Sequence, residues 1–181
     1  VDPLLTWPKF QEIIQNLKVR KILQGENTLY ITPKALHIKL WLDWWNTYGE
    51  GFHFEEFSKD IPPSLHEWFC EMFKYASESK VTSRIVRELL GGKGPFKNSE
   101  YLKTKLGAQF FLGLAEADPK SALEYLKNTV GTWSKEELLK FTTGRREVIW
   151  ALEKIAMWED LFADATRLLL ALGEAENETW S

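Results

Sequence analysis

Apolar residues near the end of the chain recur at the spacing of two amphipathic helices. The first, expected over 144–156, places Val148, Leu152 and Ile155 on one face. The second, expected over 161–172, has an apolar stripe made of Leu161, Ala165, Leu168 and Leu172, widened by Phe162 and Leu169. One helix cannot shield such a stripe from water, so the two are expected to pack against each other and against a preceding pair. The pattern therefore predicts a helical array.

The first 48 residues show a different order, in which a hairpin separates two helices. The segment that opens with Trp7-Pro8 predicts a helix to about Leu17, because an apolar side chain recurs every three or four residues: Phe10, Ile13, Ile14 and Leu17. Residues 19–24 and 28–31 then flank the turn sequence at 25–27, which predicts a β-hairpin. Helix, hairpin and helix in this order are typical of the end of a winged-helix domain.

The helix after the hairpin is expected to begin at Thr32-Pro33, as N-cap and first helical residue, and to end near Tyr48. One side of it carries Leu36, Leu40, Trp44 and Tyr48, with Trp41 and Trp45 beside them. Glycines at 49 and 51 break the pattern. We therefore expect a winged-helix remnant at 1–48 and a connector, acting as a hinge, at 49–61.

Residues 62–181 predict a lobe of successive helices. The helices are expected to start at Pro62-Pro63, Val81, Ser99, Asp118-Pro119 and Ser134, and each of these starts except Val81 carries a residue type that favours a helix start. Ser134 and Glu137 have the spacing of a capping box, and the short link at Asp118 predicts two neighbouring antiparallel helices. The predicted fold class is all-α: an antiparallel helical array, HEAT- or TPR-like, with a small N-terminal winged-helix remnant containing one β-hairpin.

Composition narrows the possible functions. Aromatic residues make up 14% of the 181 residues and include nine Trp, which suggests helix contacts filled by rings. The net charge of −3 gives no general reason to expect nucleic-acid binding. A single cysteine, Cys70, and the lack of a signal peptide or a long apolar run suggest a cytoplasmic protein without a membrane contact. The chain starts without Met and ends without a helix stop, so we expect a piece of a longer polypeptide, with its lobe truncated at the C-terminus.

For three groups of candidate residues, a structural explanation is favoured over a functional one. The Gly-rich segment 91–96 contains a Lys, but a phosphate loop needs Ser or Thr after that Lys and a preceding strand, so we expect an interhelix turn. His66 and Cys70 share a helix face, with His53 as the nearest further metal ligand, which is too few for a metal site. Carboxylate pairs are expected to be solvated rather than catalytic: Glu67 with Glu71, and Glu174 with Glu178. We therefore expect no catalytic, cofactor-binding or metal-binding residue.

Two groups of cations are candidates for contacts with a neighbouring domain or a partner. The first group lies around the hairpin and includes Lys18, Arg20, Lys21, Lys34 and Lys39. Such residues could meet phosphates in a winged-helix DNA binder, but an acidic neighbouring domain is the favoured partner. The second group, Arg145-Arg146, stands at a helix start, where cations oppose the helix dipole. We expect a salt bridge to a neighbouring helix or domain there, or an exposed pair in a loop.

Several of these segments together resemble a known family. They are 145–153, 162–172 and 174–177 in the closing pair, 29–36 after the hairpin, and 94–96 and 107–111 between them. This set resembles the helical region of large prokaryotic STAND NTPases, the signal-transduction ATPases with numerous domains, of the antiphage-defence type. Gly173 departs from the pattern, because the family more often has a small helix former there.

The resemblance implies an architecture and a role. An upstream domain would bind ATP and Mg²⁺, and this chain would relay its state to downstream sensor repeats that bind a protein ligand, with oligomerisation of the intact protein on activation. The chain has no phosphate-loop motif, so it would be a non-catalytic relay and scaffold. Two other readings are a free-standing helical adaptor that binds a partner through exposed Trp residues, and a winged-helix DNA-binding protein.

Overall fold

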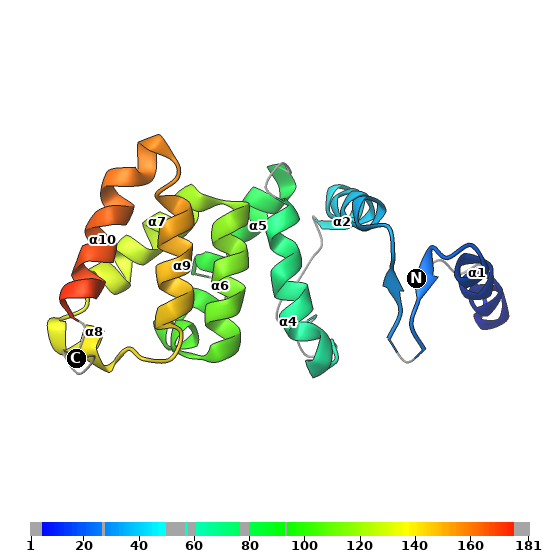
Figure 1. Cartoon of the computed structure of the whole chain (residues 1–181), viewed down its shortest axis with the longest axis horizontal. Coiled ribbons are helices and arrows are strands. Elements are labelled where there is room, and N and C mark those ends of the chain that lie inside the picture. The colour runs from blue at the N-terminus through cyan, green and yellow to red at the C-terminus, as the bar shows by residue number, and fades with distance from the viewer. Residues whose placement is uncertain are drawn as a thin grey trace. The chain divides into compact units, whose positions relative to one another are not determined.

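The fold is described from a computed structural model, which places residues 5–26, 28–49, 57, 61–76, 80–92 and 94–175. The described part is mostly helical and contains a two-stranded antiparallel sheet, so the predicted helical-array class is confirmed (Figure 1). The chain divides into two compact units, Val1–Trp44 and Trp45–Ser181. The division falls inside a helix, before the connector expected at 49–61, and most of that connector lies outside the described residues.

The first unit contains α1 (Trp7–Val19), β1 (Leu23–Gln24), β2 (Tyr30–Ile31) and the beginning of α2 (Lys34–Tyr48). The strands pair antiparallel, with Leu23 opposite Ile31 and Gln24 opposite Tyr30. The hairpin is therefore present. No residue of α1 is buried, and Trp7 on its apolar face is 67% exposed.

The helix before the hairpin is longer than expected, and the first strand is shorter. Hydrogen bonds from the N–H of Lys21 to the carbonyl of Lys18, and from Ile22 to Leu17, close the C-terminus of α1. This pair of bonds is a Schellman motif, and it places Lys21 at φ +58°, where glycine is usual. Residues 19–21 thus end a helix instead of starting a strand. The next helix begins at Lys34, one residue after the expected Pro33, and its first hydrogen bond runs from the N–H of His37 to the carbonyl of Pro33.

The second unit is the helical lobe. Its α-helices after α2 are α4 (Pro63–Met72), α5 (Lys80–Leu90), α6 (Lys105–Ala117), α7 (Pro119–Asn128), α8 (Lys135–Lys140), α9 (Arg145–Ile155) and α10 (Phe162–Glu174). Short 3₁₀ segments link them: η2 (Phe73–Ala76), η3 (Pro95–Lys97), η4 (Ser99–Lys103), η5 (Val130–Thr132) and η6 (Glu159–Leu161). Helix α6 lies at the centre and packs against α4, α7 and α9 (Figure 1).

Aromatic rings fill the core of the lobe. The Phe73 ring lies 5.3 Å, centroid to centroid, from Trp45 and 5.4 Å from Phe110. Phe96 continues the series, 5.9 Å from Phe110 and 5.7 Å from Tyr125. This chain of rings links α2, η2, α6, η3 and α7 into one core, since edge-to-face and tilted ring pairs add to the stabilisation from apolar burial.

Helices α6, α7 and α8 are each capped by a side chain, although not always by the expected residue. Asp118 caps α7 by accepting a hydrogen bond from the N–H of Ser121, and Ser134 forms the predicted capping box with Glu137. The prediction that Ser99 caps the long helix ending at Ala117 is wrong. The chain forms a 3₁₀ segment at 99–103, and Thr104 caps α6 by accepting from the N–H of Gly107 at 3.0 Å. The helix therefore begins five residues later than expected.

The closing pair packs largely as its apolar pattern predicts. The three stripe residues of α9 are buried, as are Ala165, Leu168 and Leu172 of α10. Phe162 is an exception, because its side chain is 56% exposed. It is the first residue of α10, directly after the 3₁₀ turn, where the helix has not yet reached the core.

None of the helices in the described ranges is both long and apolar enough to cross a lipid bilayer.

Candidate functional site

Arg145, one of the expected contact residues, joins helices within the lobe. Its guanidinium donates to the carbonyl of Leu138 at 2.7 Å and to the carbonyl of Leu172. These carbonyls lie in the last turns of α8 and α10, where helix dipoles concentrate partial negative charge. The partner is therefore a set of helix C-termini in place of the carboxylate that a salt bridge would require. This arrangement explains why a cation stands at the start of α9.

Arg146 has a different environment. Its side chain is exposed, and its guanidinium carbon lies 5.8 Å from the ring centroid of Trp150, one turn further along α9. A cation above an exposed aromatic ring stabilises a helix only modestly. Arg146 and Trp150 remain on the outer surface of the lobe, where a partner can reach both of them.

The other expected contact residues belong to the first unit. Arg20 and Lys21 are exposed at the end of α1, and Lys34 is exposed at the start of α2. Of the two neighbouring cations, Lys39 forms an ion pair with Asp43 at 2.7 Å. Arg20 and Lys21 thus present positive charge at the C-terminal end of α1.

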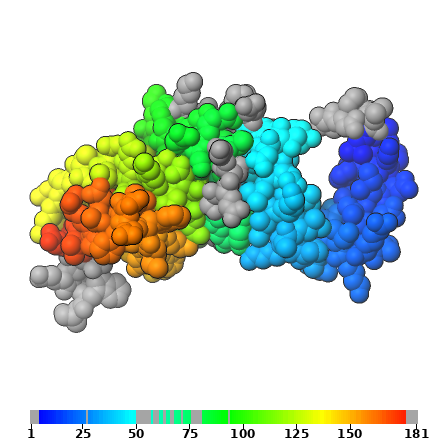
Figure 2. Space-filling view, turned by 90° about the horizontal axis from the view of Figure 1, so that it is seen from above, coloured from blue at the N-terminus to red at the C-terminus, as the bar shows by residue number. Residues whose placement is uncertain are grey.

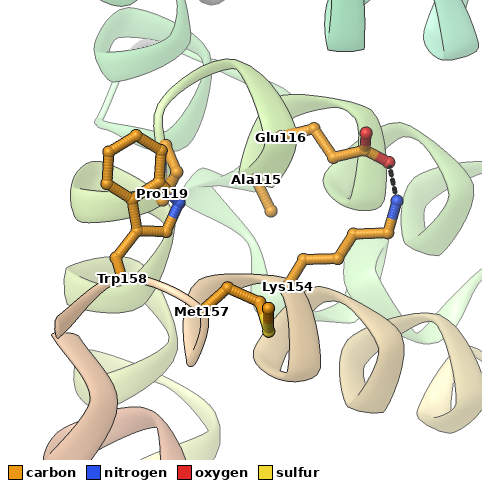
Figure 3. Close-up of a pocket in the computed structure, with 6 residues that line it drawn as sticks. All are labelled: Ala115, Glu116, Pro119, Lys154, Met157 and Trp158. Carbon is orange, nitrogen blue, oxygen red and sulfur yellow. Dashed lines mark hydrogen bonds and ion pairs between the residues drawn. The ribbon is translucent and has the colours of Figure 1, made fainter.

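A surface hollow of about 270 Å³ lies at one end of the lobe, where the α6–α7 link meets the turn between α9 and α10 (Figure 3). Its lining consists of Ala115, Glu116, Pro119, Lys154, Met157 and Trp158. Figure 2 shows the orange segment that contains the α9–α10 turn on the surface of the lobe, beside the yellow-green atoms of the preceding helices. The turn that lines one side of the hollow therefore lies at the surface of the lobe.

The lining residues divide the hollow into an apolar side and a charged side. Trp158 stands beside Pro119, and Met157 lies below them and extends toward Lys154 (Figure 3). The charged side is formed by the ion pair between Lys154 of α9 and Glu116 of α6 (Figure 3). This ion pair joins the two helices across the open edge of the hollow.

The apolar side of the hollow carries two large apolar residues that are unusually exposed to solvent. Met157 is 86% exposed and Trp158 is 59% exposed, whereas Ala115 is buried. Both exposed residues lie in the turn after α9, which the hydrogen bonds from Met157 to Lys154 and from Trp158 to Ile155 hold in place. The turn thus keeps two large apolar side chains in water, where they are available to a partner.

Acidic residues predominate in the two chain segments that line the hollow. Within two positions of the lining residues, all inside the described ranges, the chain has five carboxylates and two ammonium groups: Glu116, Asp118, Glu153, Glu159 and Asp160 against Lys120 and Lys154. This excess of three acids equals the net charge of the whole chain. The hollow therefore combines an apolar surface with flanking chain segments in which acids outnumber bases.

Only some of the other candidate residues lie among those that the structure describes. In the segment 91–96, residues 91 and 92 form a turn after α5 and residues 95–97 form η3, with Phe96 buried, whereas Lys93 lies outside the described residues. The side chains of His53, His66, Glu67, Glu71 and Glu178 lie outside the described residues. Among the side chains that are described, no three of His, Cys, Asp or Glu are grouped closely enough to hold a metal ion.

Sequence reasoning missed the hollow. Its signal was the apolar pair Met157-Trp158, which falls between two helices and is followed directly by Glu159-Asp160. Apolar residues in a turn do not contribute to a helical stripe, so a search for helical periodicity passes over them.

Comparison with known proteins gave no match: no protein-family model, no curated protein and no solved structure is significantly similar to the chain.

Proposed function

We propose that this chain is a non-catalytic relay and scaffold segment of a multidomain signal-transduction NTPase of the STAND class. In this proposal residues 1–48 complete a winged-helix domain, and residues 62–181 form a HEAT- or TPR-like lobe. The lobe transmits the state of an upstream nucleotide-binding domain to downstream sensor repeats. The basis for the class is the resemblance of the segments 29–36, 145–153 and 162–172.

The observation that carries the proposal is the contrast in burial between the two units. No residue in the described part of 5–44 is buried, although α1 has a complete apolar face. The lobe, in contrast, has one continuous core and a clamp at Arg145 that ties α8, α9 and α10 together. A rigid lobe attached to a segment that needs a covering partner is suited to relaying movement between domains.

The first test concerns the upstream coding sequence. We expect the reading frame before Val1 to encode a phosphate-loop motif, with glycine, four residues, glycine, lysine and then serine or threonine. A start codon directly before this segment, or an upstream domain without that motif, would contradict the assignment to this class of NTPase.

The second test concerns the chain itself. Isothermal titration of residues 1–181 with ATP and Mg²⁺ is expected to give no heat of binding, because the nucleotide would be held by the upstream domain. A saturable binding signal would show that the chain carries a nucleotide site of its own and would overturn the relay assignment.

A second candidate function is a helical adaptor that binds a protein partner. The exposed Met157 and Trp158 beside the hollow favour this function, because large apolar residues at a surface are the usual anchors of protein interfaces. An adaptor would bind its partner without any attached nucleotide-binding domain. The upstream reading frame therefore distinguishes the two candidates.

A further inference from the structure

We propose that the hollow between the α6–α7 link and the α9–α10 turn binds a basic segment of a partner protein. One large apolar side chain of that segment enters the hollow beside Trp158, and flanking Lys or Arg residues meet the surrounding carboxylates. This inference rests on the proposed scaffold function, for which it specifies the class of partner.

The shape of the hollow supports an apolar anchor. The buried Ala115 and the ring of Pro119 form apolar walls, and Met157 and Trp158 supply flexible and aromatic contact area. A hollow of about 270 Å³ has room for one large side chain and is too small for a typical drug-sized ligand. Trp at such a position is the residue type most often found to dominate the binding energy of a protein interface.

The charge distribution selects a basic partner. Glu153, Glu159 and Asp160 are exposed, and each is next to or one turn away from Met157 or Trp158. The Glu116 carboxylate already pairs with Lys154, and the Asp118 carboxylate accepts hydrogen bonds from Ser121, so Glu153, Glu159 and Asp160 are the acids available to a partner. Opposite charges on the partner would increase its association rate and exclude acidic competitors.

The same charges disfavour other occupants. A second copy of this chain would bring an identical acidic surface against the first, which is repulsive in a self-complementary contact. An anionic lipid surface would be repelled for the same reason. The excess of three acids thus favours a basic protein segment over both of these alternatives.

The test uses the full chain and a fluorescein-labelled peptide in which a central Phe-Leu pair is flanked on each side by Lys-Gly-Lys. We expect saturable binding by fluorescence anisotropy that weakens as the salt concentration rises. Two control peptides, one with Glu in place of Lys and one with Ala-Ala in place of Phe-Leu, are each expected to bind about tenfold more weakly or not at all.

Variants of the chain separate a specific site from general attraction between opposite charges. Trp158→Ala leaves the net charge unchanged and is expected to weaken peptide binding about tenfold or more. Trp7→Ala, which removes an equally accessible ring from the other unit, is its matched control and should have no effect. The double change Glu159→Lys and Asp160→Lys should also abolish binding, whereas Glu12→Lys with Glu26→Lys should weaken it far less.

The outcomes decide between this inference and its alternatives. Equal peptide binding by the native chain and the Trp158→Ala variant would overturn the inference. It would also be overturned if analytical ultracentrifugation showed that the native chain self-associates and that Trp158→Ala abolishes this self-association. Stronger binding to anionic vesicles than to the peptide would also overturn it. If the upstream reading frame encodes a phosphate-loop motif but the peptide does not bind, only this inference is contradicted. If the peptide binds but the motif is missing, only the relay function is contradicted.

Discussion

At the scale of single residues, Arg145 shows how a side chain can offset an unfavourable position on its own helix. As a cation at the start of α9 it opposes that helix's dipole, but its guanidinium reaches the C-terminal carbonyls of α8 and α10. The sequence indicated that Arg145 stands in an unusual position. It could not identify the carbonyls, because Leu172 is 27 residues away along the chain.

We predict that Arg145→Ala lowers the free energy of unfolding by about 2–3 kcal/mol, because it removes charged hydrogen bonds to partly buried carbonyls. Arg146→Ala is the matched control and should cost less than about 0.5 kcal/mol, since only an exposed cation–ring contact is lost. Urea denaturation followed by circular dichroism measures both values. Equal losses for the two variants would show that the Arg145 clamp contributes nothing.

Tyr125 makes the stability of the lobe decrease with rising pH in the alkaline range. Burial raises the pKa of its hydroxyl from the ordinary value of 10.0 to about 12. The unfolded chain would therefore ionise this residue first, so the stabilising contribution is complete below pH 10 and is lost as the pH rises toward 12.

The matching prediction compares the native chain with Tyr125→Phe. Urea midpoints measured near pH 9 and near pH 11 should fall for both proteins, and the decrease should be smaller for the variant, which has no ionisable hydroxyl at this position. Identical decreases would mean that the Tyr125 hydroxyl is ionised as easily in the folded chain as in the unfolded one.

At the scale of elements, the start of α6 shows a case in which tertiary packing, and not local N-cap preference, decides where a helix begins. Ser99 and Thr104 are both suitable N-cap residues, and the sequence favoured Ser99 because its helix could then continue to Ala117. In the structure Asn98 caps the 3₁₀ segment and Thr104 caps α6. The interruption places the ring of Tyr101 5.1 Å from Phe96, so core packing decides between two caps of similar local strength.

Replacing each residue with Ala tests this assignment. Thr104→Ala should reduce stability by about 1 kcal/mol, because the N–H of Gly107 loses its acceptor. Ser99→Ala should change stability by less than about 0.5 kcal/mol. The opposite ranking in thermal or urea denaturation would restore Ser99 as the helix start.

Gly113 and Gly173 allow a second comparison between elements. A Cβ at Gly113 would collide with the carbonyl oxygen of Cys70, where α6 and α4 approach closely, whereas a Cβ at Gly173 would meet open space. Gly113→Ala is therefore expected to cost about 1–3 kcal/mol. Gly173→Ala should stabilise α10 by up to about 1 kcal/mol, since Ala is the better helix former. Chemical denaturation of the two variants should give changes of opposite sign.

At the scale of the whole molecule, the two units differ in how much apolar surface they bury. The second unit buries rings from several helices, while the described residues 5–44 include none that is buried. A segment with so little buried apolar area cannot offset the conformational entropy lost on folding. Its exposed helix face is consistent with the proposal that it completes a larger domain.

We predict that a peptide of residues 1–44 is largely unfolded by far-UV circular dichroism and melts without a cooperative transition. Residues 45–181 should give a single cooperative transition, because their helices share one core. A cooperative transition for the peptide would show that the first unit needs no partner surface.

The candidate contact residues were predictable only as isolated positions. Positive charge beside the hairpin and at the start of α9 was visible in the sequence, and the structure places Arg20, Lys21 and Arg146 at the surface. The hollow was not visible, because its residues come from α6, α7, α9 and the following turn. No periodic pattern connects residues that meet only after these helices have packed.

The sequence by itself determined the helical class, the hairpin, the capping box at Ser134 and the buried faces of α9 and α10. These features depend on short-range spacing, which sets local hydrogen bonding and the side of a helix that is apolar. The tertiary structure alone decided the start of α6, the partners of Arg145 and the position of the hollow. Each of these depends on contacts between distant segments, where packing and carbonyl geometry outweigh local preferences of about 1 kcal/mol or less.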